Sequence, residues 1–483
     1  GSEMCIRDRT DEEAYRYIHS LWTMIENRRT TVNGRIIVGG KGRKHPKEAD
    51  VFLHIAMKVA KNCRYVEPQF TLRFDKDTSE EIWDEALDAL GAGATYPTLY
   101  NDDVNVPAVM YGMRVDEKAA EQYVPFGCTE FVIQGQSTGT PNICINLLKL
   151  LTIYMNDGID PIDGKRKSGP VPLKKLEEYQ TFEEFYDGYK ALLDYYLDLS
   201  VKAQYHSYEV MNQHVSFLFT SLLTDDCIAR GKALLDGGVR YLGGTNETYG
   251  NINTSDSLWV IRDLVFNQKK YTLRQLNDAM LANFNGYEAL RKDCLNCDKY
   301  GNDLETADTM ANDLYEFVAK GVRNRGIAIG MQYFLIVISN NQLNTEWGNR
   351  TAASPDGRLS CMYMNPANNP QGGANKSGPT AMLNSLAKFD AKYHGGSVQN
   401  IKFSPSMFNE NRAVIKSLFK TYFAKGGCHL MVTVVDKGVL EDAVEHPENY
   451  PDLIVRVSGF SAVFVDLSPN IQQELLSRVL YDK

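Results

Sequence analysis

Long apolar segments are missing from this chain of 483 residues. The two most apolar stretches, 145–155 and 334–339, are too short or too interrupted by Lys149 to span a bilayer. The N-terminus shows no export signal, and residues 1–9 resemble a non-native leader. We therefore expect a soluble, cytoplasmic protein without membrane association.

An excess of positive charge is also missing. The chain has 52 Lys and Arg against 61 Asp and Glu, a formal net charge of −9. This balance gives no reason to expect nucleic acid as a partner, and no basic run is long enough to suggest an anionic membrane surface. The nine cysteines are irregularly spaced, which fits a reducing compartment better than a disulfide framework.

Metal and phosphate motifs are incomplete where they occur. Cys294 and Cys297 have the spacing of a zinc or redox pair, but no second pair follows at a suitable distance. The segment 38–42 lacks the Ser or Thr that follows lysine in a phosphate loop. The eight histidines show no HExxH or paired spacing. The sequence therefore predicts no metal in this chain.

Strand and helix patterns are present and alternate along the chain. Runs rich in β-branched and aromatic residues predict strands at 69–74, 330–337, 429–436, 453–458 and 462–466. Helix starts are predicted at three capping boxes beginning at Thr78, Thr181 and Thr272 and at two Thr/Ser-Pro pairs, Thr140-Pro141 and Ser468-Pro469. Apolar residues make up 43% of the chain, enough for a sizeable interior. The pattern predicts an α/β fold with one core.

Two short motifs carry the chemical interest. Near the C-terminus, the segment Arg456–Ala462 reads RVSGFSA, with Gly459 between apolar runs. Glycine alone offers an α-carbon hydrogen with no side chain to crowd a planar radical, although Ser-Gly is also ordinary turn punctuation. Far upstream, Cys128 and Glu130 stand in the sequence Gly-Cys-Thr-Glu. By itself each of these two residues reads more simply, as a buried small hydrophobe and a surface charge.

Taken together, the two motifs resemble those of the glycyl radical enzymes, the superfamily of pyruvate formate-lyase, and within it the Gly-Cys-x-Glu dehydratase and lyase branch. Further stretches resembling family signatures follow in the family's order: Lys299–Asp303, Ser354–Arg358, Ser377–Ala381, Gln472 and Arg478. The resemblance implies a ten-stranded α/β barrel, with the cysteine loop and the glycyl radical loop meeting inside it. It also implies that an N-terminal portion of the family's fold is missing here. We expect a partial barrel domain over 10–350 and a glycine radical domain over 351–483.

The resemblance also implies a mechanism. Gly459 would store a protein-based radical, Cys128 would become a thiyl that takes a hydrogen atom from substrate, and Glu130 would accept a proton from a substrate hydroxyl. In an extended loop the side chains at i and i+2 point the same way, so Cys128 and Glu130 would face one cavity. A separate activating enzyme with an iron–sulfur cluster and S-adenosylmethionine would install the radical, and the family suggests a homodimer acting on a small molecule.

Several reactions remain open. Pyruvate formate-lyase uses two adjacent cysteines, whereas Gly127 and Thr129 flank Cys128 here, which disfavours formate C-acetyltransferase activity. Elimination of water, an amine or a similar group is the first hypothesis, and decarboxylation is the second. Diol-type members of the family carry an acidic residue soon after the cysteine loop, but 131–155 contains none. A catalytically silent fragment is the alternative from another class.

Overall fold

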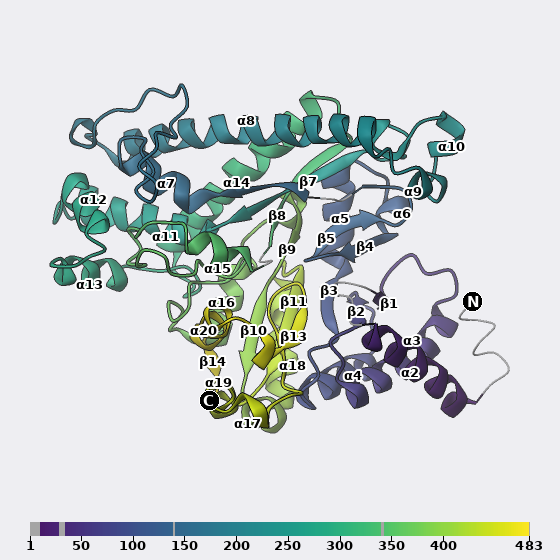
Figure 1. Cartoon of the computed structure of the whole chain (residues 1–483). Coiled ribbons are helices and arrows are strands. Elements are labelled where there is room, and N and C mark those ends of the chain that lie inside the picture. The colour runs from purple at the N-terminus through teal and green to yellow at the C-terminus, as the bar shows by residue number, and fades with distance from the viewer. Residues whose placement is uncertain (1–9, 29–33, 139–140, 340–341, 483) are drawn as a thin grey trace.

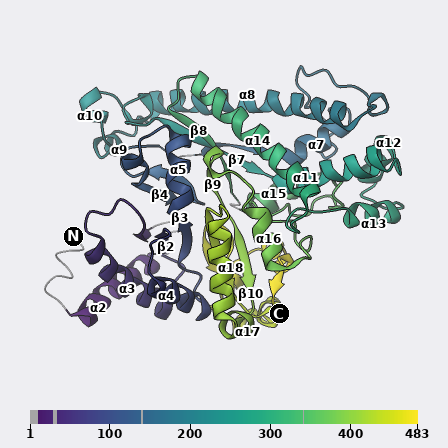
Figure 2. The same ribbon diagram turned by 180° about the vertical axis from the view of Figure 1, so that it is seen from behind.

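The computed structural model describes residues 10–28, 34–138, 141–339 and 342–482. The expected leader, residues 1–9, and the helix cap expected at Thr140 lie outside these described residues. In Figure 1 the long helix α8 (Phe182–His214) runs along the top, and the C-terminal segment lies at the lower centre. Figure 2 shows the reverse side, where α14 (Glu305–Ala328) runs below α8.

The larger sheet has six strands in the order β1-β2-β3-β11-β10-β14. Its strands pair in parallel except at one junction, where β3 and β11 are antiparallel. This junction joins an N-terminal strand to a C-terminal one, so the two ends of the chain build one sheet. The bounds are β1 (Arg35–Gly39), β2 (Gln69–Phe74), β3 (Thr98–Asn101), β10 (Asn400–Phe403), β11 (His429–Val434) and β14 (Leu480–Tyr481).

The smaller sheet has four parallel strands in the order β6-β7-β8-β9. They are β6 (Pro141–Asn146), β7 (Gly243–Tyr249), β8 (Tyr333–Ile338) and β9 (His394–Ser397). Every residue of β8 is buried, as expected for a parallel strand that is covered on both faces. Because the described strands form two separate sheets and two hairpins, the ten-stranded barrel count stays a prediction.

Helices cover the outer face of the four-stranded sheet. Helix α14 packs on β8, and α8 packs on β6 and β7. On β7, Asn246 points to this outer face, where its Nδ2 donates to Ser200 Oγ of α8 at 2.7 Å. Since side chains alternate along a strand, the neighbouring Glu247 points to the opposite, inner face. The inner face of this sheet therefore carries the buried carboxyl group of Glu247.

The remaining helices surround the sheets, and within the described ranges none is both long and apolar enough to cross a membrane. The longer ones are α2 (Asp11–Asn27), α3 (Pro46–Cys63), α4 (Glu80–Gly91), α5 (Asp102–Met113), α7 (Leu147–Met155), α11 (Asn251–Val260), α12 (Leu273–Leu281), α13 (Glu288–Asn296), α16 (Gly378–Leu386), α18 (Arg412–Ala424), α19 (Lys437–Glu445) and α20 (Pro469–Ser477).

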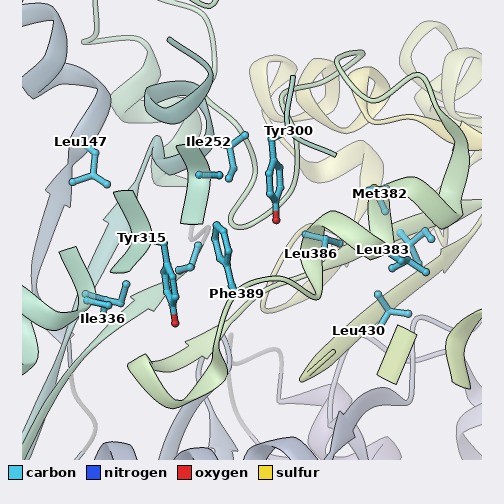
Figure 3. Packing of buried hydrophobic residues seen from close by; sticks show 14 of the residues in the cluster. Leu147, Ile252, Tyr300, Tyr315, Ile336, Met382, Leu383, Leu386, Phe389 and Leu430 are labelled. Carbon is cyan, nitrogen blue, oxygen red and sulfur yellow. The ribbon is translucent and has the colours of Figure 1, made fainter. Parts of the chain in front are cut away.

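One large apolar cluster joins the two sheets (Figure 3). Smaller buried clusters lie outside it, so the single core expected from the sequence stays a prediction. At the centre of the large cluster Tyr315 of α14 stacks on Phe389, with ring centroids 4.5 Å apart and an interplanar angle of 5°. The cluster continues from Ile336 of β8 to Leu383 of α16 and Leu430 of β11. The C-terminal part is therefore packed into the same interior as the middle of the chain.

Most of the predicted helix starts are confirmed, with two corrections. Thr272 forms the full capping box with Gln275, and Ser468 precedes α20 as its N-cap. Helix α4 begins one residue later than predicted, because Ser79 is its cap. The helix predicted directly after Thr140-Pro141 is wrong: strand β6 comes first, and Asn146 then caps α7 by accepting from the Lys149 N–H at 2.9 Å.

Candidate active site

Cys128 lies at the tip of a β-hairpin. Strands β4 (Tyr123–Phe126) and β5 (Glu130–Ile133) pair in antiparallel register, with Phe126 opposite Glu130. The three tip residues include Gly127 at φ +50° and Thr129 at φ +102°, both in the left-handed region. The extended loop expected here is therefore wrong, since a tight turn brings Glu130 close to the thiol.

Gly127 provides the space for the Glu130 carboxyl. A Cβ at Gly127 would lie 2.8 Å from Glu130 Oε2, so a larger residue would displace the carboxyl group. Glu130 is 3% exposed, and its Oε2 has no hydrogen-bond partner among the described residues. The glycine of the Gly-Cys-x-Glu motif is thus needed both for its backbone angle and for the carboxyl behind it.

Gly459 lies at the tip of a second hairpin, formed by β12 (Ile454–Arg456) and β13 (Ser461–Val463). A Cβ at Gly459 would lie 2.5 Å from Cys128 Cβ and 2.6 Å from Cys128 Sγ. Both residues are buried. The two hairpin tips are therefore in contact, and the Cys128 thiol lies directly against the Gly459 α-carbon.

Side chains from α20 and the residue that follows it hydrogen-bond to the backbone of the Gly459 hairpin and fix its position. Arg478 Nη2 donates to Val457 O at 2.6 Å, and the same guanidinium pairs with Glu474, which is 2% exposed. Gln472 Nε2 donates to Phe464 O at 3.0 Å, just beyond β13. Arg478 and Gln472, two of the sequence landmarks, thus bind the backbone before and after the Gly459 tip.

Two arginines lie near the contact between the tips. Arg35 of β1 donates to Gly127 O at 2.7 Å. Arg456 is 1% exposed and its guanidinium lies over the Tyr96 ring, 5.2 Å from the centroid. Their charges favour anionic forms at the site, but burial dominates: it raises the pKa of Glu130 to about 8 and the pKa of Cys128 well above its usual value. The thiol therefore stays protonated, as a hydrogen-atom donor requires.

Sequence reasoning missed a second carboxylate. Glu247 on β7 is 2% exposed, and its charge raises the pKa of both Cys128 and Glu130 after the larger effect of burial. Its register partner on β6 is Cys144. The strand sequence GGTNETY has no apolar alternation, so only its place in the sheet reveals Glu247.

The cysteine pair Cys294 and Cys297 lies at the end of α13, away from these residues in the sequence and bonded locally. Cys294 is fully buried in the core, and Cys297 Sγ donates to Asp293 O at 3.4 Å. In the described part of the chain, the one gathering of three potential metal ligands is His54, Glu81 and Glu85, on α3 and α4. Cys297 Sγ also lies 3.9 Å from Asp263 Oδ2, but among the described residues the two cysteines do not form part of a close group of three ligands.

Comparison with known proteins identifies the family of this chain. The pyruvate formate lyase-like family model matches residues 7–343, and the glycine radical model matches residues 364–465. Trans-4-hydroxy-L-proline dehydratase of Clostridioides difficile is 30% identical over 428 residues, which are 88% of this chain and 54% of that protein. The 4-hydroxyphenylacetate decarboxylase glycyl radical subunit of C. difficile (strain CD196) is 26% identical over 497 residues, covering 92% of this chain and 54% of its own length.

The glycerol-bound B12-independent glycerol dehydratase of Clostridium butyricum has a similar structure, with a TM-score of 0.89 and 28% identity over 99% of this chain and 62% of that one. The chain thus has the α/β barrel fold of these enzymes and spans about half the length of the curated relatives it matches. With both family models matched and both motifs in contact, the chain belongs to the pyruvate formate lyase-like family of glycyl radical enzymes.

Proposed function

We propose that this chain belongs to a glycyl radical enzyme that cleaves a carbon–heteroatom bond by elimination. The contact between Cys128 and Gly459 carries the proposal, because a hydrogen atom can pass directly between the thiol and the α-carbon. The Gly459 radical takes the hydrogen atom of the Cys128 S–H, which restores glycine and leaves a thiyl radical. The thiyl then takes a hydrogen atom from a substrate carbon.

Glu130 is the proton-transfer group beside the thiyl in this proposal. Because burial raises its pKa to about 8, its carboxyl is mostly protonated at neutral pH. A protonated carboxyl is suited to give a proton to a leaving hydroxyl or amine. The ionised form of a carboxyl with this pKa can also accept the proton of a substrate hydroxyl, so the expected role of Glu130 as proton acceptor stays a prediction.

Decarboxylation is the second candidate, supported by the similarity to a decarboxylase subunit. Acyl transfer is less well supported, since Gly127 and Thr129 flank Cys128 and no second thiol adjoins it at the hairpin tip. The substrate names of the relatives supply probes for all these reactions: trans-4-hydroxy-L-proline, glycerol and 4-hydroxyphenylacetate.

The organisation of the whole protein is proposed with its function. We infer a division into a barrel domain, 10–350, and a glycine radical domain, 351–483, although strands of both regions share each sheet. A ten-stranded barrel would require further strands beside β1 and β6, which are sheet edges among the described strands. We also propose a cytoplasmic homodimer, activated by a radical S-adenosylmethionine enzyme, with no metal in this chain.

Anaerobic activation followed by electron paramagnetic resonance tests the proposal. A doublet that is lost in Gly459→Ala would support a glycyl radical at this position. The activated sample is then supplied with each of the three probe substrates and its products are analysed. A chain that is folded but gives no doublet with any activating enzyme of the family would instead be the catalytically silent fragment.

A further inference from the structure

An internal cavity of about 40 Å³ lies where the C-terminal segment meets the six-stranded sheet. Its walls come from β10 and β11 of the sheet, from β12 of the Gly459 hairpin, and from α20 and the residues after it. A cavity of this size has room for about three water molecules or for one small polyatomic ion. Neither Cys128 nor Gly459 lines it, so it is separate from the contact between the two hairpin tips.

Three basic side chains belong to residues that line this cavity: Lys402 of β10, Arg456 of β12 and Arg478 after α20. Arg478 is neutralised by Glu474, because its Nε donates to Oε1 at 2.9 Å and its Nη2 donates to Oε2 at 2.7 Å. No acidic residue is among the described residues that line the cavity. The positive charges of Lys402 and Arg456 are therefore not balanced by the cavity wall.

Lys402 has few acceptors for a buried ammonium group. It is 8% exposed, and among the described residues its Nζ makes one hydrogen bond, to Leu475 O at 3.0 Å. Burial, followed by the charge of Arg478, lowers the pKa of Lys402 to about 8, so the group is still mostly protonated at neutral pH. Since an ammonium carries three donors, most of its hydrogen-bonding capacity is left for a ligand.

Arg456 also lacks an anionic partner. It is 1% exposed, and its Nε and Nη1 contact Met431 Sδ at 3.1 Å and Ser461 Oγ at 3.3 Å. Its Nη2 has no hydrogen-bond partner in the described part of the chain. Burying a charge is costly unless the charge is paired, and here two cations from different segments border one cavity without a carboxylate between them.

We propose that this cavity binds a small oxyanion of the size of formate or bicarbonate. The oxygen atoms of the ion accept hydrogen bonds from the Lys402 ammonium and the Arg456 guanidinium, and its negative charge offsets theirs. Because Lys402 belongs to the sheet and Arg456 to the Gly459 hairpin, the ion fastens the hairpin to the sheet. The site requires no radical, so it stands or falls independently of the proposed function.

Equilibrium dialysis of the unactivated full chain tests the site. The protein is dialysed against ¹⁴C-labelled formate or ¹⁴C-labelled bicarbonate, and sodium gluconate, whose carboxylate is too bulky for the cavity, keeps the ionic strength constant. We expect saturable binding of a single ion per chain, and the tighter of the two ions identifies which oxyanion the cavity fits. A folded chain that binds neither ion would overturn the proposal.

A pair of lysine variants locates the bound ion. Lys402→Met removes the buried ammonium and should weaken binding roughly 10–100-fold, as expected for the loss of a hydrogen bond to a charged group. Lys437→Met, which removes an exposed lysine of α19, is the matched control and should bind as the parent does. Parent-like affinity in Lys402→Met, or an equal loss in Lys437→Met, would overturn the site.

A variant that changes volume rather than charge covers the case in which Lys402→Met does not fold. Val435→Leu lengthens an apolar side chain of the cavity wall and should also weaken binding, because it narrows the cavity. Parent-like affinity in a folded Val435→Leu protein would then overturn the site.

Discussion

The two hairpins that meet in the site use glycine for different reasons. At Gly127 the backbone is left-handed, φ +50°, and the carboxyl of Glu130 fills the space beside it. At Gly459 no left-handed angle is involved, and the space is filled instead by Cys128 of the other hairpin. A glycine can therefore be required because its backbone angle is left-handed, or because a residue far away in the sequence fills the space where its side chain would lie. Only the second case brings two separate segments together into one site.

The largest effect is expected at the Gly459 tip. Gly459→Ala should abolish the radical doublet and all turnover, because the methyl group has no room against Cys128 and the proposed radical position is lost. Spectroscopy after anaerobic activation measures this. Gly438→Ala in α19, where only Asp436 Oδ1 lies near the new methyl at 3.1 Å, is the control and should keep the signal. A doublet of parent intensity in Gly459→Ala would place the radical elsewhere.

Cys128→Ser should separate the two tips functionally. We expect the glycyl doublet to remain and turnover to vanish, because the O–H bond is too strong for a glycyl radical to break. Turnover per radical is the measurement, with the exposed Cys361→Ser as the matched control. Normal turnover in Cys128→Ser, or an equal loss in Cys361→Ser, would contradict the assignment of the thiyl to the hairpin tip.

Glu130→Gln should change how stability depends on pH. The folded state raises the pKa of Glu130 to about 8, so the folded protein binds this proton more tightly than the unfolded chain. The contribution of this proton to the free energy of unfolding is complete below about pH 4. It falls by up to about 1.4 kcal/mol per pH unit as the pH rises toward 8. Denaturant unfolding at pH 5 and pH 7.5 should show a smaller decline in Glu130→Gln than in the parent. Equal declines would indicate that the carboxyl is not held neutral.

Gly127→Ala should have the smallest effect, a loss of about 1–3 kcal/mol in the free energy of unfolding from its left-handed backbone, plus the clash with Glu130. The double variant Gly127→Ala/Glu130→Ala removes the clash and keeps the backbone cost. Denaturant unfolding of the parent, Gly127→Ala, Glu130→Ala and the double variant separates the backbone cost from the clash. If the double variant were no more stable than additive losses predict, the carboxyl would not be what Gly127 makes room for.

The sequence allowed prediction of the parts of the molecule whose signals are local. All five predicted strand segments contain strands, but the strand predicted at 462–466 is wrong beyond Val463, where Phe464–Asp466 form a 3₁₀ helix. The signal is strongest in β2 and β8, where every residue is buried. The family resemblance identified Cys128 and Gly459, which the fold brings together. Strands β6 and β7 were missed, since Thr140-Pro141 resembled a helix start and β7 has polar residues at buried positions. Glu247 was missed with them, because only strand register brings it to the inner face.

The attachment of the C-terminal segment has a consequence for oxygen damage. Oxygen cuts a glycyl radical backbone at the radical position, which we propose to be Gly459. The segment beyond it pairs with β10 through β14, and Arg478 donates to Val457 O on the other side of the cut. Ile471 and Leu475 of α20 are also buried in a shared apolar cluster with β12. The severed peptide should therefore stay bound without a covalent link: native mass spectrometry would report one particle, and denaturing conditions would release two chains.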